Sequence, residues 1–269
     1  MAGCNYDCEN CSSKCEKKSF LEKPNPNSNI KNIIAVMSGK GGVGKSLVAG
    51  LLASALNNAG LNVGIIDADV TGPSIPKMFG VKGTLYQNEL GIIPNVSKSG
   101  VKMVSANFIV KEENDPVVWR GPLVASLVKQ FYKDVAWGDL DYLIIDCPPG
   151  TGDVPLTVFQ SIPINDIIVV TTPQELVSMI VSKAVKMANM MNINILGVVE
   201  NMSYVKCPNC DEIIEIYGPS KINEITESFN LDVLAKLPFD KEIAIRCDNG
   251  TISDYNNIYF IELVRKLLQ

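Results

Sequence analysis

Residues 39–46, GKGGVGKS, have the types and spacing of a loop that holds phosphate groups. They match the pattern of a glycine, any four residues and then Gly-Lys-Ser. Glycines let the backbone wrap around a phosphate chain, with its N–H groups pointing inward at the start of a helix. We expect Lys45 to reach the β- and γ-phosphates of a nucleotide and the Ser46 hydroxyl to bind Mg²⁺. The other residues of this predicted P-loop are Gly39, Lys40, Gly41, Gly42, Val43 and Gly44.

Three aspartates follow apolar runs that read as buried strands. IIDADV carries Asp67 and Asp69, and YLIID ends at Asp146. Open α/β sheets bind ligands at the carboxyl ends of their strands. Phosphate hydrolysis needs a carboxylate that orients water and acidic groups near the metal ion. Asp146 has the Walker B position, so we expect it to hold Mg²⁺ through water. A single aspartate often only caps a helix, but three in these places favour a nucleotide site.

Cysteines form two groups. Cys4, Cys8, Cys11 and Cys15 have C-x₃-C-x₂-C-x₃-C spacing, which lets four thiolates converge on one cluster or ion. Iron–sulfur, zinc and no fixed metal all remain open there. Cys207 and Cys210 form a CxxC that fits a redox pair, half of a zinc site, or two ligands of a metal shared between subunits. A redox pair usually opens a helix, whereas this one precedes DEIIEIYG, which resembles a hairpin arm.

Composition restricts the class of protein. The 269 residues include no histidine, and their formal net charge of −5 and pI near 5.0 argue against non-specific binding of nucleic acid. No run of about 18 apolar residues is present, so we expect no transmembrane helix. The N-terminus does not have the pattern of a signal peptide. We therefore expect a cytoplasmic protein, in whose reducing compartment clustered thiols bind metals rather than form disulfides.

Strands and helices alternate around these residues. Short apolar runs predict buried parallel strands at 32–37, 62–67, 141–146, 166–172 and 193–201. Helices are expected at 46–60, with Gly60 as its stop, and over 175–191. This alternation predicts an α/β fold with a mostly parallel, doubly wound sheet. A polar segment with two prolines, residues 16–31, reads as a tether. We therefore divide the chain into a Cys-rich extension, 1–31, and a P-loop domain, 32–269.

Lys40, a second lysine within the loop, gives the sequence a resemblance to the deviant Walker A ATPases, which include MinD, ParA, the nitrogenase iron protein and the Mrp-type iron–sulfur carriers. The resemblance implies ATP as the nucleotide and a homodimer in which Lys40 reaches the partner's nucleotide. It also implies that Asp69 orients the attacking water and that Asp67 lies near Mg²⁺. Asn201 would read the adenine ring, flanked by Pro238 of the LPFD loop.

The motifs GKGGVGKS, DADVTGPS, DCPPGTGD, NMSY and CPNC occur in the order that is typical of the Mrp-type carriers. MinD and ParA proteins lack this CxxC, and the nitrogenase iron protein uses two separated cysteines. The resemblance implies an ATPase that assembles a [4Fe–4S] cluster and transfers it to apoproteins, without a membrane partner. Since a cubane needs four thiolates, we expect Cys207 and Cys210 of two chains to share one cluster.

Two other functions remain open at this point: a MinD-type positioning or partitioning switch, and a zinc-stabilised scaffold. MinD-type proteins typically end in a basic amphipathic helix, but only Arg265 and Lys266 are basic near this C-terminus. The N-terminal cysteines are spaced more closely than in the similar eukaryotic proteins. We expect no small extra domain of the kind that many similar bacterial proteins carry.

Overall fold

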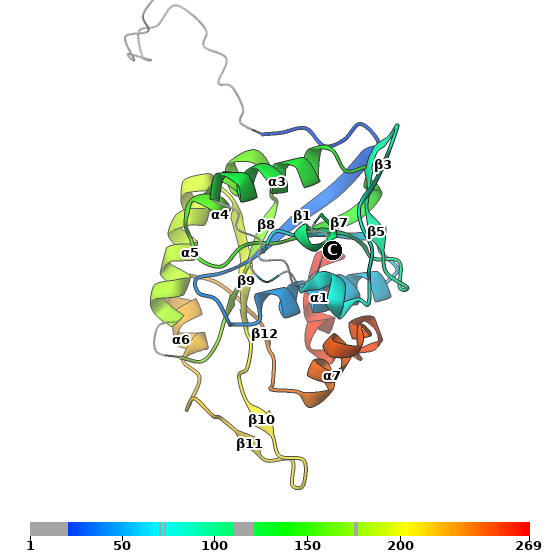
Figure 1. Cartoon of the computed structure of the whole chain (residues 1–269). Coiled ribbons are helices and arrows are strands. Elements are labelled where there is room, and N and C mark those ends of the chain that lie inside the picture. Colours follow the sequence, from blue (N-terminus) through cyan, green and yellow to red (C-terminus); the bar gives the residue numbers. More distant parts are fainter. Residues whose placement is uncertain (1–20, 70–71, 73, 110–120, 175–176) are drawn as a thin grey trace, which may run out of the picture.

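The structure is a computed structural model, and it describes residues 21–69, 72, 74–109, 121–174 and 177–269. The four N-terminal cysteines lie outside these residues. A central sheet is covered by helices on both faces (Figure 1). The strands are β1 (Ser28–Ser38), β2 (Val63–Asp67), β3 (Tyr86–Asn88), β4 (Gly91–Ile93), β5 (Asn95–Val96), β6 (Lys102–Ser105), β7 (Gly138–Asp146), β8 (Asp166–Thr171), β9 (Asn194–Glu200), β10 (Val205–Lys206), β11 (Ile213–Ile214) and β12 (Val233–Lys236). The helices are α1 (Lys45–Asn58), α2 (Ile75–Met78), α3 (Gly121–Lys133), α4 (Asp153–Ser161), α5 (Val177–Met191), α6 (Ile222–Ser228), α7 (Lys241–Asn249) and α8 (Ile261–Leu267).

Within the described residues, the main sheet has eight strands in the order β12-β9-β8-β1-β7-β2-β6-β5. All neighbouring pairs are parallel except β5 with β6. The five strands expected from apolar runs form its centre as β1, β2, β7, β8 and β9. The predicted fold class, a doubly wound and mostly parallel α/β sheet, is confirmed. Because parallel strands end at one edge, the carboxyl ends of β1, β2 and β7 meet there.

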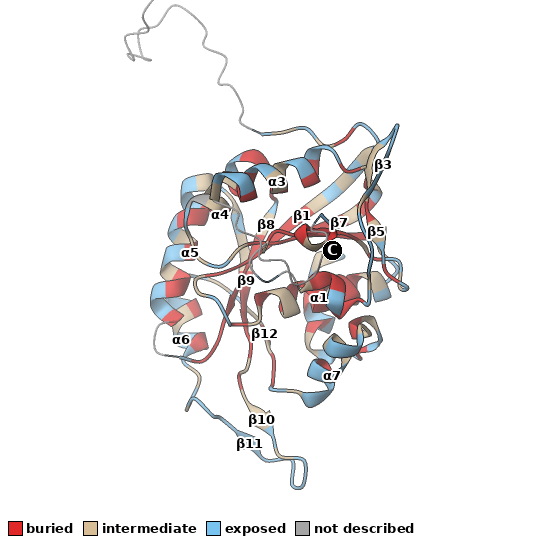
Figure 2. Ribbon diagram, viewed as in Figure 1, coloured by how far each residue is buried: buried red, intermediate tan, exposed pale blue. Residues whose placement is uncertain are grey.

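Two hydrophobic cores lie on opposite faces of the sheet. One packs α1, α2, α7 and α8 against it, and the other packs α3, α4, α5 and α6. Buried residues therefore follow the sheet and the inner sides of the helices (Figure 2). Helix α1 ends near Gly60 as expected, and the φ of Gly60 is +88°. This framework fixes the loop between β1 and α1.

Strand β1 begins earlier than its apolar run, at Ser28 rather than at residue 32. The first residues of the strand pair only with β7, with Ser28 opposite Gly138. Before the strand, the buried Asn25 side chain donates to the carbonyl oxygens of Leu90 and Asp134, at 3.0 and 3.2 Å. These polar contacts hold residues 25–31 against the body, and an apolar pattern cannot reveal them. The functional division at residue 31 stays a prediction.

The C-terminal segment packs against the body as helix α8. Phe260 and Leu263 are buried in the core that contains α1. Arg265 and Lys266 form ion pairs with Glu262 and Asp232. In the described part of the chain, no helix combines the length and apolar character needed to span a bilayer.

Candidate nucleotide site and metal-binding cysteines

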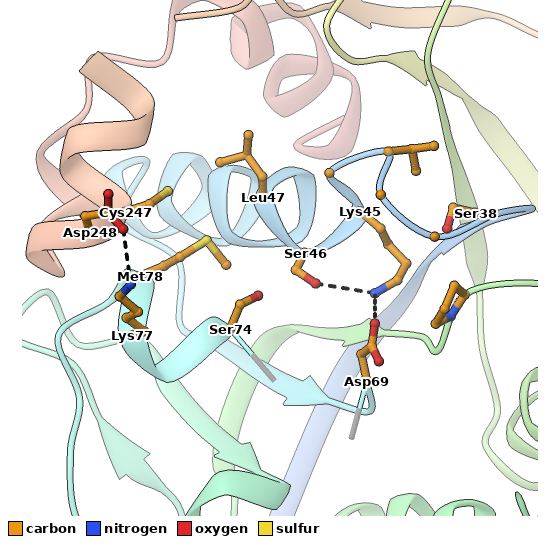
Figure 3. A pocket seen from close by; sticks show the side chains of 15 residues that line it. Ser38, Lys45, Ser46, Leu47, Asp69, Ser74, Lys77, Met78, Cys247 and Asp248 are labelled. Atoms are coloured by element: carbon orange, nitrogen blue, oxygen red, sulfur yellow. Dashed lines mark hydrogen bonds and ion pairs between the residues drawn. The ribbon is translucent and has the colours of Figure 1, made fainter. Parts of the chain in front are cut away.

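The P-loop joins β1 to α1 and lines a pocket of about 390 Å³ (Figure 3). Gly42 and Gly44 have φ angles of +79° and +80°, in the left-handed region that glycine adopts most easily. No described side chain caps the N-terminus of α1, so its first N–H groups are available to an anion. The pocket is lined by Ser38, Gly41, Gly42, Val43, Gly44, Lys45, Ser46, Leu47, Asp69, Ser74, Lys77, Met78, Pro149, Cys247 and Asp248.

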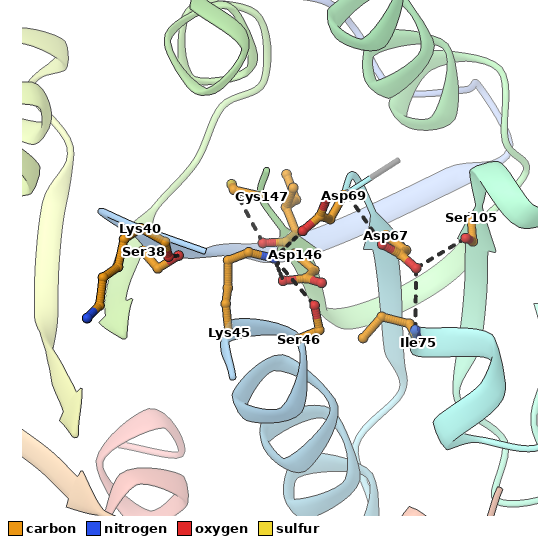
Figure 4. Close-up of polar contacts among 11 residues, drawn as sticks. Ser38, Lys40, Lys45, Ser46, Asp67, Asp69, Ile75, Ser105, Asp146 and Cys147 are labelled. Carbon is orange, nitrogen blue, oxygen red and sulfur yellow. Dashed lines mark hydrogen bonds and ion pairs between the residues drawn. The ribbon is translucent and has the colours of Figure 1, made fainter. Parts of the chain in front are cut away.

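Lys45 is the cation at the base of this pocket. Its side chain is only 5% exposed and forms an ion pair with Asp146 (Figure 4). Its ammonium also lies 3.7 Å from Asp69 Oδ2 and donates to Ser46 Oγ at 3.4 Å. Burial alone would lower the pKa of Lys45, but the neighbouring carboxylates of Asp146 and Asp69 more than offset this, and the pKa is raised. The structure therefore brings together four of the predicted residues.

Asp67 and Asp146 lie directly opposite each other at the ends of β2 and β7. Both are fully buried, and burial raises the pKa of each carboxyl, well above the usual range for Asp67. Ser105 donates to Asp67 Oδ2 at 3.1 Å, whereas no described residue donates to Asp146 Oδ2. Two buried carboxylates facing one lysine leave negative charge uncompensated, and a divalent cation would offset it. The residues present therefore fit Mg²⁺.

Lys40 and Gly39 belong to the loop but not to the pocket lining. The Lys40 ammonium donates to Gln174 Oε1, which follows β8, and points away from the ammonium of Lys45 (Figure 4). Asn201 and Pro238 are both buried and also lie outside the pocket lining. The Asn201 Nδ2 donates to the carbonyl oxygen of Val43 at 2.9 Å. Contacts of these four residues with a nucleotide stay predictions.

The pocket includes residues that the sequence did not suggest. Lys77 of α2 and Asp248 of α7 form an ion pair of 3.1 Å at its rim (Figure 3). Met78 and Cys247 line the pocket beside them. No motif marks these residues, because only the packing of α2 against α7 brings them to the P-loop.

Cys207 and Cys210 lie in the loop of the β10–β11 hairpin, which projects from the body (Figure 1). This confirms the predicted hairpin arm. Both thiols are free, Cys207 is half-buried and Cys210 exposed. Hydrogen bonds from the backbone N–H groups of Asn209 and Cys210, together with the Cys210 thiol, lower the pKa of Cys207. A thiolate is the form that binds metals, and this turn favours the thiolate of Cys207.

The other two described cysteines differ in character. Cys147 is fully buried, and burial raises the pKa of its thiol to about 12. The half-buried Cys247 has a pKa raised to about 11, mainly by burial and also by Asp248. Cys147 therefore packs in the core. Within the described residues, no group of three or more His, Cys, Asp and Glu side chains could hold a metal ion. The described hairpin thus carries two free thiols.

A family model and similar relatives point to the same family of proteins. Residues 29–268 match the ParA family described as NUBPL iron-transfer P-loop NTPase. An iron–sulfur cluster carrier protein of Methanocaldococcus jannaschii is 44% identical over 260 residues, covering 93% of this chain and 90% of that protein. The carrier protein of Clostridium perfringens is 43% identical, with 84% and 82% covered.

Among solved structures, a nucleotide-binding protein of Archaeoglobus fulgidus in complex with ADP has a TM-score of 0.76 at 42% identity, covering 84% of this chain and 89% of that one. MinD in the MinC–MinD complex of Aquifex aeolicus has a TM-score of 0.62 at 16% identity, covering 88% and 95%, and shares the fold alone. The length of the family match and the identity to the carriers lead to one conclusion. This chain belongs to the NUBPL iron-transfer P-loop NTPase family.

Proposed function

We propose that this protein binds and hydrolyses ATP, assembles a [4Fe–4S] cluster on a homodimer and transfers it to apoproteins. The observation that carries the proposal is the presence of two sites in one compact chain. A P-loop with a buried Lys45–Asp146 pair lies in the body, and a cysteine pair with one stabilised thiolate lies on a projecting hairpin. The similarity to iron–sulfur cluster carrier proteins supports the same proposal.

The nucleotide is ATP, with its phosphates in the P-loop and Lys45 against them. Ser46, Asp67 and Asp146 hold Mg²⁺, which supplies charge neutralisation on the phosphates. The buried Asp146 Oδ2 without a donor among the described residues supports this assignment. Asp69 is positioned to orient water, since its carboxylate lies on the pocket wall near Lys45.

The homodimer follows from the number of ligands. Two cysteines per chain are too few for a cubane, and a two-fold axis supplies the matching pair. Large apolar side chains flank the cysteines and are about half exposed: Ile213, Ile214 and Ile216 are 53%, 48% and 56% exposed. A second copy would cover such a surface. Lys40 would then be free to leave Gln174 for the partner's nucleotide. We place this activity in the cytoplasm, where thiols stay reduced.

A cluster held at such an exposed site is accessible to a recipient apoprotein, as a carrier requires. The experiment is anaerobic reconstitution of the full-length protein with iron and sulfide, followed by iron, sulfide and zinc analysis. Transfer to an apo [4Fe–4S] enzyme then measures the second half of the proposal. We expect Cys207→Ala and Cys210→Ala to lose transfer, and Ser228→Ala, which removes an exposed hydroxyl of α6 outside both the hairpin and the P-loop pocket, to retain it. Zinc without iron would instead favour the zinc-stabilised scaffold.

A further inference from the structure

The cysteine hairpin is attached to the body close to the two ends of its segment. The Ser203 N–H donates to the Leu237 carbonyl oxygen and the Phe239 N–H donates to the Tyr204 carbonyl oxygen, both at 2.8 Å, and the rings of Tyr217 and Phe239 lie 6.5 Å apart. Residues 201–221 leave the sheet after β9 and return at α6. Their only ladder within the described chain pairs two residues on each side, Val205 with Ile214 and Lys206 with Ile213. An isolated two-stranded hairpin is marginally stable in water. The position of Cys207 and Cys210 relative to the body therefore depends on how the two ends of this segment are held.

Glu200, the last residue of β9, is the residue whose side chain bonds to both ends of the segment. Its side chain is 1% exposed. The Ser203 hydroxyl donates to Glu200 Oε2 at 2.5 Å, and the Ser220 hydroxyl donates to Oε1 at 2.7 Å. Ser220 Oγ also accepts from the Ile222 N–H at the start of α6, at 3.3 Å. Since hydrogen bonds to a buried charged group are worth more than those between neutral groups, one carboxylate fixes the exit and the return of the segment.

Asn201, the residue that follows Glu200 in the sequence, contacts the P-loop. Asn201 is buried and donates to the Val43 carbonyl oxygen at 2.9 Å. The approach is so close that a Cβ on Gly44 would lie 2.1 Å from Asn201 Nδ2. The Leu237 N–H donates to the Glu200 carbonyl oxygen at 2.8 Å, which places the LPFD loop against the same strand end. A change in the backbone position of Val43 and Gly44 would therefore displace the Asn201 side chain.

A second route runs from Lys40 to the same carboxylate. Lys40 donates to Gln174, and Gln174 lines a cavity of about 380 Å³ together with Glu200, Tyr217 and Lys221. Tyr217 and Lys221 belong to the returning part of the cysteine segment. Val43 and Lys40 of the P-loop are thus connected to Glu200 by two separate sets of neighbouring residues.

We propose that Glu200 is a positioning residue that couples the nucleotide state of the P-loop to the placement of Cys207 and Cys210. Nucleotide in the P-loop changes the contacts of Val43 and Lys40, and Glu200 passes the change to Ser203 and Ser220. The cysteine segment then takes a different position when nucleotide is bound. Coupling of this kind needs an element with two arrangements, which the weakly attached hairpin provides. The inference rests on the proposed binding of nucleotide, but not on the identity of the cluster.

The test measures the alkylation rates of Cys207 and Cys210 in the full-length, metal-free protein, with and without MgADP. Mass spectrometry of the iodoacetamide-labelled peptides distinguishes these thiols from the other six. In the wild type, we expect MgADP to change the rate by about fivefold, the lower end of usual coupling between sites. In Ser220→Ala, which removes one anchor, and in Glu200→Gln, which removes the charge but keeps the shape, we expect this change to disappear. Affinity for MgADP should stay within about threefold, because neither residue lines the P-loop pocket.

Thr226→Ala is the matched control. Its hydroxyl is also buried beside the segment, but it donates to the Ile222 and Asn223 carbonyl oxygens at the start of α6. This variant should respond to MgADP as the wild type does.

If Glu200→Gln does not fold, the response of Ser220→Ala alone tests the inference, since Ser203 still pairs with the Glu200 carboxylate in that variant. If MgADP binds but leaves the wild-type rates unchanged, or if both variants respond normally, the inference is wrong and the proposed function stands. If MgADP does not bind at all, the proposed function fails and the inference fails with it.

Discussion

Lys45 and Asp146 form a buried ion pair between the start of α1 and the end of β7. These residues are 101 positions apart in sequence, and they meet because β1 and β7 are neighbours in the sheet. The pair places the ammonium at the base of the P-loop pocket and leaves one oxygen of Asp146 without a donor among the described residues. The P-loop therefore has its cation in place, and the carboxylate retains one oxygen for a metal ion or its water.

Replacing Lys45 with Met should weaken MgADP binding by about 10- to 100-fold, because a hydrogen bond to a charged group contributes about 1.5–3 kcal/mol. Isothermal titration calorimetry measures the loss. Lys31→Met is the control, since Lys31 pairs with Asp141 at the opposite end of β1 and 65% of its side chain is exposed. An unchanged dissociation constant in Lys45→Met would show that the P-loop lysine does not bind the nucleotide.

Asp69→Asn should bind MgATP almost as the wild type does and hydrolyse it about 100-fold more slowly, the lower range for a group that assists proton transfer. Its carboxylate lies on the pocket wall, whereas Asp67 and Asp146 lie beneath it, fully buried. Phosphate release under saturating ATP gives the rate, and calorimetry gives the affinity. Loss of binding together with hydrolysis would assign Asp69 to the metal ion instead of the water.

The described thiols should differ in reactivity with pH. The lowered pKa of Cys207 predicts that its thiolate is present below the ordinary thiol range, so its alkylation rate rises and levels off at lower pH than that of an unperturbed cysteine. Cys247 and Cys147, with pKa values raised to about 11 and about 12, should remain almost unreactive at pH 8. Peptide mass spectrometry of the metal-free protein across pH 6–9 measures all three. Equal rates at Cys207 and Cys247 would contradict the proposed role of the backbone N–H groups.

Deleting residues 1–18 should leave the ATPase folded, with melting temperature and ATP turnover close to those of the full chain. The two cores and the P-loop pocket are built from residues further along the chain. After reconstitution, bound iron should fall but not vanish, because Cys207 and Cys210 remain. Calorimetry and iron analysis of both forms check this. A truncated protein without any iron would make the N-terminal cysteines the main cluster site.

Short-range patterns in the sequence were sufficient for the central strands, the P-loop and the CxxC hairpin. Each of these depends on neighbours in the chain: glycines that allow a tight loop, or an apolar run that fits a buried strand. β6 and β12 were not foreseen, because four-residue runs such as KMVS and VLAK do not differ enough from loops. The early start of β1 was also missed, since polar residues form that part of the strand.

Contacts between distant segments could not be predicted in the same way. The Lys77–Asp248 pair depends on the packing of α2 against α7. The two bonds to Glu200 join a strand end to serines 3 and 20 positions later, and no periodic pattern marks such hydroxyls. The sequence indicates which residues have suitable chemistry, whereas the tertiary structure determines which of them meet.

The central claim is that one cluster bridges two chains through Cys207 and Cys210. The most direct measurement uses the full-length protein with Cys4, Cys8, Cys11 and Cys15 changed to alanine, reconstituted anaerobically. Iron and sulfide analysis, combined with native mass spectrometry, should give a dimer with about four irons, or about two per chain. A further Cys207→Ala or Cys210→Ala change should remove the iron and weaken the dimer. About four irons per chain on a monomer, or an intact cluster after either further change, would contradict the bridging arrangement.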